Sequence, residues 1–226
     1  MPPNVSPPAR RQRPRGTITR DAVVVAALAV ADRVGLHALT IRAVARQVGA
    51  APMSLYTHFA NKDELIDLMY SEMVRHLYED GGNATWQAEI AAVCRRIYAT
   101  LLEHPKWVPL LARSSTPIDV PVRERILTMM AADGITPDTG LGVLSSTGLA
   151  TVGLVVAQLT YLDEMGQASL SQRYQVLREG STTATTAPLT REAVRAMQEL
   201  HMHDVFERTL AALIKGHEVT AHAGPG

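Results

Sequence analysis

Residues 39–65 read LTIRAVARQVGAAPMSLYTHFANKDEL, and their capping residues and apolar spacing predict two short helices followed by a long one. Thr40 predicts an N-cap for a short helix over residues 41–48, which Gly49 ends. A second short helix is expected over residues 51–59, with a proline in its first turn. Asn61 and Glu64 are spaced as in a capping box and predict a long helix that continues to about Asp80. The apolar residues of the two short helices are spaced to pack inward, which is typical of a helix-turn-helix: Ile41, Val44, Ala45, Val48, Leu55 and Phe59.

Helical patterns continue on both sides of this stretch. A helix is expected over residues 22–34, with Thr19 as its N-cap and Gly35 after its end. Further helices are expected at about 85–103, 106–114, 120–132, 140–164 and 190–215, and no alternating strand pattern is present. Phe, Trp and Tyr make up only 4% of the chain, so the core must be mainly aliphatic. The chain is therefore predicted to be all-α, with an N-terminal three-helix domain followed by a larger helical domain.

Charge is unevenly distributed along a chain of 226 residues whose formal net charge is zero. Residues 1–62 hold nine Lys and Arg against two Asp, whereas the remainder holds thirteen basic and twenty acidic residues. A basic N-terminal part on an acidic body indicates a polyanion partner for the first part. The Pro- and Arg-rich residues 1–16 predict a disordered basic arm. Its arginines either contact nucleic acid or only increase solubility.

Two features concern the compartment. Cys94 is the single cysteine, so an intrachain disulfide is excluded and a reducing compartment is expected. The segment from Thr139 to Leu162 has no charge and is long enough to cross a bilayer. Its hydroxyl and amide side chains, with acidic flanks that lack Lys and Arg, instead favour a helix buried on most sides. A cytoplasmic protein without a membrane partner is expected.

The helix-turn-helix stretch resembles the tetracycline-repressor (TetR) family. The motif comprises Leu-Thr-x-Arg-x-Val-Ala from Leu39, then Gly49, Leu-Tyr-x-His-Phe from Leu55 and Asn-Lys-Asp-Glu-Leu from Asn61. It covers about residues 19–70, and the tail from Phe206 is similar to the tetracycline-repressor subgroup. The resemblance implies a nucleoid-associated bacterial transcriptional regulator, a homodimer that binds an inverted-repeat operator in double-stranded DNA and is released by a small organic effector. It implies a DNA-binding domain at 17–62, a ligand-binding and dimerisation domain at 63–217, and a disordered tail at 218–226.

The chemistry of the motif suggests how DNA would be held. Lys62 and the N–H groups of its helical turn are expected to bind one phosphate. Thr40, Tyr56 and His58 can also contact phosphates, although Thr40 would equally serve as a cap, Tyr56 as a packing residue and Lys62 as a solvated lysine. Arg42 suits guanine, because an arginine can donate to it in a bidentate manner. Other base contacts are expected from the start of the second short helix: Ala51, Pro52, Met53, Ser54 and Thr57.

The body is expected to supply a dimer interface and a pocket. The uncharged helix, with Gly142, Gly148 and Gly153, would pair with the last helix in a four-helix bundle across a two-fold axis, or both would be internal core. A mobile loop is expected at 180–188. A pocket is expected between the helices of residues 65–165, and its candidate lining residues would otherwise be core: Met73, Tyr78, Cys94, Tyr98, Leu101, Trp107, Leu111, Met129, Met130 and Gln158. By resemblance, Tyr78 stands where tetracycline-binding members have a histidine, so tetracycline is not expected as effector.

An all-α enzyme or metalloprotein is the competing class. His201 and His203 are two residues apart, so on a helix they point about 200° from each other and suit one metal ion poorly. Neither a Gly-rich phosphate loop nor a nucleophile elbow is present. No catalytic residue, metal or cofactor is therefore expected. The remaining alternative is a helix-turn-helix DNA-binding factor with no small-molecule effector, which the lack of a pocket in the body would favour.

Overall fold

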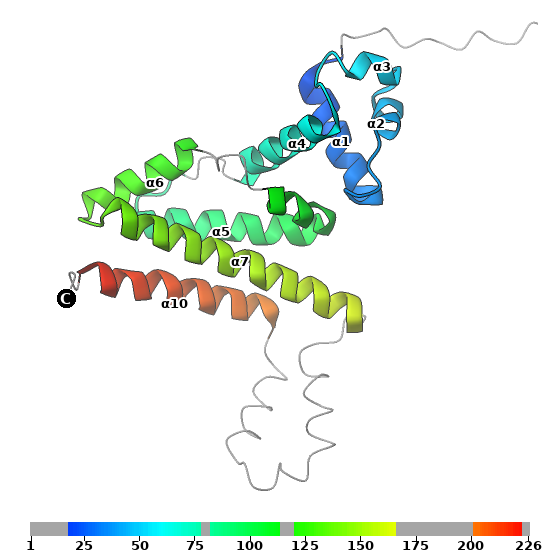
Figure 1. Cartoon of the computed structure of the whole chain (residues 1–226). Helices are drawn as coiled ribbons and strands as arrows, with labels where there is room; N and C mark the ends of the chain where they lie inside the picture. The colour runs from blue at the N-terminus through cyan, green and yellow to red at the C-terminus, as the bar shows by residue number, and fades with distance from the viewer. Residues whose placement is uncertain (1–17, 78–81, 114–119, 166–200, 223–226) are drawn as a thin grey trace, which may run out of the picture.

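The structure is a computed structural model that describes residues 18–77, 82–113, 120–165 and 201–222. Within these ranges all regular elements are helices, which confirms the all-α prediction (Figure 1). They are α1 (Arg20–Val34), α2 (Ile41–Val48), α3 (Pro52–Leu55), α4 (Lys62–Leu77), α5 (Trp86–Glu103), the 3₁₀ helix η1 (Pro105–Arg113), α6 (Val120–Ala132), α7 (Pro137–Met165) and α10 (Met202–His222). The basic arm, Tyr78, the loop at 180–188 and the predicted helix start at 190 lie outside the described residues.

Local capping places α1 and α2 where the sequence predicts them. The hydroxyl of Thr19 accepts a hydrogen bond from the backbone N–H of Ala22 at 3.1 Å, and that of Thr40 accepts one from Ala43 at 3.2 Å. Gly49 ends α2 with a left-handed φ of 72°, a conformation that a side chain would strain. These caps need no tertiary contact, which explains the match between prediction and structure.

Two predicted helices differ from the structure. The helix expected over 51–59 is α-helical only from Pro52 to Leu55 and then tightens into turns, because the N–H of His58 bonds to the carbonyl of Leu55 three residues back. The hydroxyl of Thr57 also bonds to the carbonyl of Ser54 at 2.8 Å. The segment expected at 106–114 is the 3₁₀ helix η1, which has Pro109 in its interior and therefore lacks a backbone donor there.

The long helices α7 and α10 lie side by side and antiparallel along the body (Figure 1). Arg95 of α5 forms an ion pair of 2.7 Å with Glu207 of α10, and Ser146 of α7 bonds to His217 of α10 at 2.9 Å. The predicted start of a disordered tail at residue 218 is wrong, because α10 continues to His222. Beyond Gly216, which the helix accommodates, no Gly or Pro stands before Gly224, so no residue in between favours an earlier end.

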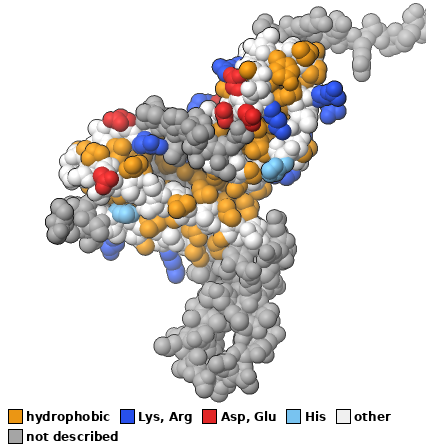
Figure 2. Space-filling model, viewed as in Figure 1, with side chains coloured by type: hydrophobic (Ala, Val, Ile, Leu, Met, Phe, Trp, Pro, Cys, Tyr) orange, Lys and Arg blue, Asp and Glu red, His pale blue; other side chains and the backbone are white. Residues whose placement is uncertain are grey.

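The prediction that α7 is buried on most sides is also wrong. The segment Pro137–Thr160 has a mean hydropathy of 1.7, which by length and composition is enough to cross a membrane, yet only 28% of its apolar window is buried within the chain. Leu141, Leu149 and Val156 are 47%, 77% and 43% exposed. Figure 2 shows hydrophobic side chains at the surface along this helix. One face of α7 thus lacks a covering element among the described residues.

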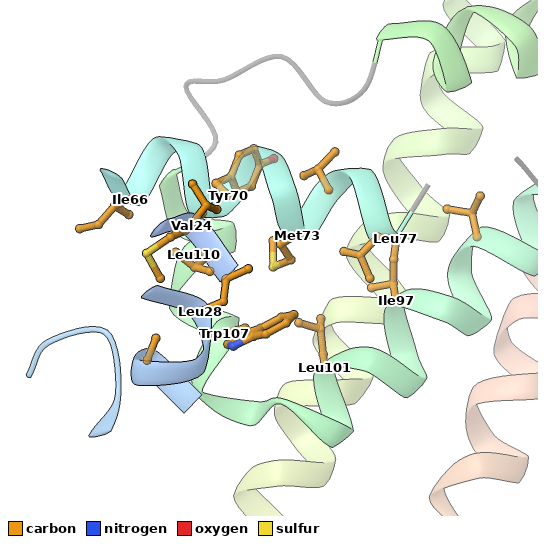
Figure 3. Packing of buried hydrophobic residues seen from close by; sticks show 14 of the residues in the cluster. Val24, Leu28, Ile66, Tyr70, Met73, Leu77, Ile97, Leu101, Trp107 and Leu110 are labelled. Carbon is orange, nitrogen blue, oxygen red and sulfur yellow. The ribbon is translucent and has the colours of Figure 1, made fainter. Parts of the chain in front are cut away.

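The helix α4 joins the helix-turn-helix to the body through a shared core. Its buried residues Tyr70, Met73 and Leu77 contact α1 on one side and η1 and α5 on the other (Figure 3). The C-terminal carbonyl at Leu77 accepts a hydrogen bond from Nε of Arg96 on α5, at 3.1 Å. The hydrophobic cluster therefore runs without a break from α1 to α10.

Candidate DNA-binding surface and effector pocket

The short helix α3 is anchored by one face and presents the other to solvent. Leu55 is fully buried and Phe59 is 3% exposed, which fixes the segment on the core. The residues expected to contact DNA bases are all exposed: Arg42, Ala51, Pro52, Met53, Ser54 and Thr57. Met53 is 77% exposed, which is unusual for a large apolar side chain and suits contact with a thymine methyl group. Figure 2 shows hydrophobic side chains over this region with Lys and Arg side chains beside them.

Hydroxyl groups on α3 and in the turn after it are oriented by hydrogen bonds to the local backbone. Ser54 donates to the carbonyl of Ala51 at 2.7 Å, and Thr57 donates to the carbonyl of Ser54 at 2.8 Å. Each hydroxyl oxygen keeps its lone pairs free to accept from a base amino group. The Tyr56 ring is tilted at 5.7 Å against Phe59 and the residue is still 44% exposed, so Tyr56 both packs on the core and contacts solvent.

The capping groups around α4 keep its first turn rigid. Asn61 Oδ1 accepts from the N–H of Glu64 at 2.9 Å, and Glu64 Oε2 accepts from the N–H of Ala60 at 2.6 Å. The other oxygen of Glu64 pairs with Arg20 at 3.1 Å, which ties α4 to the start of α1. The side chain of Lys62 is left exposed at the positive end of α4. Thr40 is exposed at the start of α2, whereas His58 is half-buried.

Three cations on this surface are exposed and form no ion pair or hydrogen bond with the described part of the chain: Arg42, Arg46 and Lys62. Arg33, by contrast, donates to Gln47 at 2.8 Å and so links α1 to α2. Arg46 was not among the residues expected to bind DNA. Its spacing of four residues from Arg42 places both on the same side of α2, and that spacing was the signal available in the sequence.

A pocket of about 90 Å³ lies between α5, α6 and α7. Its walls are mostly aliphatic, with a few polar groups: Ile90, Val93, Cys94, Ile97, Val122, Arg123, Ile126, Leu141, Leu144, Ser145, Thr147 and Gly148. Burial raises the pKa of the Cys94 thiol, and hydrogen bonds with Thr151 and Thr147 offset only part of this effect. The thiol is therefore protonated at neutral pH and acts as a weakly polar wall.

The residues expected to line a pocket are distributed differently. Cys94 does line it, but Met73, Leu101, Trp107 and Met130 are buried core residues that do not. Tyr98 stacks on Phe206 at 4.1 Å and donates to Gln158, and Leu111 and Met129 are half-buried against the core. Large side chains fill the space between the helices around them. The cavity lies instead beside the short side chain of Ser145 and beside Gly148, which has no side chain.

The histidines that first suggested a metal site serve other contacts. The His203 ring lies against Tyr98 and Phe206 with centroids 6.1 and 6.3 Å away, and His201 is exposed just before α10. Across the described ranges, no group of three or more His, Cys, Asp and Glu residues is arranged to hold a metal ion.

Comparison with known proteins identifies both parts of the chain. Residues 23–69 match the family described as bacterial regulatory proteins, tetR family, and residues 80–221 match the tetracyclin repressor-like C-terminal domain. The HTH-type transcriptional repressor DrrR1 of Streptomyces coeruleorubidus is 33% identical over 189 residues, 83% of this chain and 66% of that protein. The chain thus spans just under two thirds of this relative's length.

Solved structures show the same fold. The transcriptional regulator SCO7222, a TetR protein from Streptomyces coelicolor, superposes with a TM-score of 0.76 at 20% identity, over 90% of this chain and 99% of that one. The TetR family protein ActR of the same organism, in complex with actinorhodin, gives 0.72 at 22% identity, over 91% and 99%. At such low identity these neighbours establish the architecture alone: a helix-turn-helix domain on a larger helical body.

Proposed function

The chain belongs to the TetR family of bacterial regulatory proteins, and from this premise we propose that it is a cytoplasmic transcriptional repressor that a small organic molecule releases from its operator. Residues 17–62 serve as the DNA-binding domain and residues 63–217 as the ligand-binding and dimerisation domain. The observation that carries this proposal is the course of α4. Its first residue, Lys62, stands exposed beside α3, and its last turns are buried in the body.

The exposed surface around α3 supports contact with the major groove. Arg42 and Met53 are exposed, Arg42 has no hydrogen-bond or ion-pair partner among the described residues, and the two are suited to guanine and to thymine methyl groups. Ala51, Pro52, Ser54 and Thr57 complete the surface that meets base edges. Thr40, Tyr56, His58 and Lys62 hold the phosphates on either side, and the positive end of α4 adds to the attraction.

Two copies of the chain are needed for an inverted-repeat operator, and the uncovered face of α7 supplies the interface. Leu149 and Val156 are exposed on it, and the small residues Gly153 and Ala157 allow close approach of a second helix. Together with α10 this forms a four-helix bundle around the two-fold axis. The burial of apolar surface that one chain leaves exposed provides the free energy of association.

The pocket in the body supports control by a ligand. A cavity with aliphatic walls and a few polar groups is the usual form of a small-molecule site. It lies between α5, α6 and α7, and α5 packs against the end of α4. A ligand that favours a different tilt of α4 changes the spacing of the two recognition surfaces. The binding of actinorhodin by ActR is a precedent in a protein of the same fold. The alternative of a DNA-binding factor without an effector is not favoured, because it leaves this cavity unexplained.

Footprinting of the purified protein on DNA that flanks its own gene tests the proposal. The expected result is a protected inverted repeat, with protection that requires a higher protein concentration in the Lys62→Ala variant at moderate salt. Arg208→Ala, on the exposed surface of α10, is the matched control and should protect as the wild type does. Protection of a single half-site by a monomer, or none on any DNA, would contradict the proposal.

A further inference from the structure

Of the described residues that line the pocket, one is charged, Arg123 on α6. It is half-buried and forms no hydrogen bond or ion pair with the residues that the structure describes. The neighbouring arginine differs: Arg125 donates to the buried carboxylate of Glu89. Arg95 on α5 is likewise paired, with Glu207. The guanidinium of Arg123 is therefore a cation at the pocket whose partner is not supplied by the described helices.

Among the described residues, the rest of the pocket offers this cation no counter-charge. Its other polar groups are the neutral hydroxyls of Ser145 and Thr147 and the protonated thiol of Cys94. The Thr147 hydroxyl already donates to the carbonyl of Val143 at 2.8 Å. A partly desolvated cation without an anion is unfavourable, and a bound anion would recover that free energy through charge-assisted hydrogen bonds.

The positive charge of Arg123 also acts on α4, the helix that begins at Lys62 in the proposed DNA-binding surface. Burial raises the pKa of the Tyr70 hydroxyl on α4, and the positive charge of Arg123 offsets part of that rise. Tyr70 is 4% exposed and packs in the core that joins α4 to α1 (Figure 3). Neutralising Arg123 would therefore change the field at a buried residue of α4.

We propose that the effector is a small organic acid whose carboxylate or ionised hydroxyl pairs with Arg123 while its apolar part lies between α5, α6 and α7. This inference rests on the proposed function, because it takes this pocket as the effector site. The volume of about 90 Å³ suits an apolar part on the order of one substituted ring. Planar pairing of guanidinium with carboxylate explains why an arginine, rather than a lysine, serves at this position.

The test compares three probes of nearly equal shape by ligand-observed NMR titration: 4-methylbenzoate, the neutral 4-methylbenzamide and the cationic 4-methylbenzylamine. Wild-type protein should bind the acid roughly tenfold or more tightly than the amide, since a charge-assisted pair contributes about that much. Arg123→Gln should remove this preference, and Arg123→Glu should reverse it in favour of the amine. Arg208→Gln, an arginine far from the pocket in sequence and exposed on α10, should keep it.

A second variant shows where the probe binds. A Cβ at Gly148, which lines the pocket, would meet no atom within 4 Å, so Gly148→Leu should leave the fold intact and place its side chain in the pocket. It should weaken all probes that enter. Equal affinity of acid and amide for the wild type, no binding of either, or an equal loss in Arg208→Gln would overturn the acidic effector. These titrations contain no DNA. A protein that protects an inverted repeat yet shows no acid preference therefore contradicts this inference alone, whereas failure of footprinting contradicts the proposed function.

Discussion

Arg42 and Lys62 are both exposed cations, yet they stand at different places relative to a DNA groove. Arg42 is in the first turn of α2 beside α3, whereas Lys62 is at the start of α4. Arg42→Ala should cost about 1–3 kcal/mol of binding and relax the preference at one base pair of each half-site. Lys62→Ala should weaken all sequences alike and lower the slope of log affinity against log salt by about one per site. Titrations on matched and mutated operators at several salt concentrations measure both effects. Equal changes in specificity would show that the two roles are wrongly assigned.

Glu89 is a buried acid of the body, 1% exposed, and it predicts a pH dependence of stability. Burial alone would raise its pKa, but hydrogen bonds from Asn83 and Arg125 outweigh burial and hold the pKa below the ordinary value. A lowered pKa means that the carboxylate stabilises the fold above pH 4.5, and that this contribution is lost as the pH falls through the folded-state value.

Glu89→Gln should therefore lower the free energy of unfolding by roughly 1–3 kcal/mol at pH 7, and by less at pH 3. Urea unfolding of wild type and variant at both pH values measures the difference. Glu207→Gln is the matched control: its pair with Arg95 is more exposed, so its loss should be about 1 kcal/mol or less. A loss in Glu89→Gln that is the same at both pH values would contradict the assignment of the pKa shift to this pair.

Helix caps and the exposure of single residues were predicted well, because they depend on local chemistry. The exposed positions of α3 and the caps at Thr40 and Asn61 follow from spacing and side-chain type alone. The lining of the pocket does not follow from them, because a cavity is the space that tertiary packing leaves empty. Trp107 and Met73 were expected there for their size, and that size is why they fill the core instead. Arg123 carries no signal in the sequence, since nothing local distinguishes it from Arg125.

At the scale of elements, the bounds of a helix could be predicted but its burial could not. The limits of α1, α2 and α5 follow from caps that act within a few residues. The length of α3 depends on competition between hydroxyl and backbone hydrogen bonds, which composition does not reveal. The exposure of α7 depends on which helices cover it. A helix that packs at a dimer interface has the composition of a core helix, although one of its faces is uncovered in the single chain.

The open face of α7 predicts the effect of a charge placed on it. Leu149 is 77% exposed in the single chain, so Leu149→Glu should leave the fold of each chain intact. In a dimer the carboxylate would be buried between two helices without a partner, which is strongly unfavourable. The variant should sediment as a monomer at micromolar concentration, where the wild type is a dimer. Thr128→Glu on the exposed surface of α6 is the control and should remain dimeric. A dimeric Leu149→Glu protein would place the interface elsewhere.

At the scale of the molecule, the two domains are one packed unit rather than separate bodies. Besides the shared core around α4, polar contacts cross from the body to the end of α1. His104 at the end of α5 contacts Asp32 with an Nδ1–Oδ2 distance of 2.6 Å, and its ring stacks on Trp107 at 4.1 Å. Lys106 of η1 donates to the last-turn carbonyl of Arg33 at 2.6 Å. A change in the body therefore has a direct path to α1 and the helices packed on it.

This connection predicts reciprocal coupling between ligand and DNA. Coupling free energies between two sites are typically about 1–3 kcal/mol, so an effector found by thermal shift should lower operator affinity roughly 5- to 150-fold rather than abolish it. Operator DNA must then lower the affinity for the effector by the same factor, because the thermodynamic cycle closes.

His104→Ala removes the contact between the end of α5 and Asp32 and changes no residue of the pocket or of the DNA-binding surface. This variant should reduce equally the effect of the effector on operator affinity and the effect of the operator on effector affinity. It should still bind the effector alone and the operator alone. Arg95→Ala, which breaks a contact within the body, should leave the coupling unchanged. The measurement is effector affinity by calorimetry with and without saturating operator, in all three proteins. An effector that binds the wild type equally well in both conditions would show that the pocket does not control DNA binding.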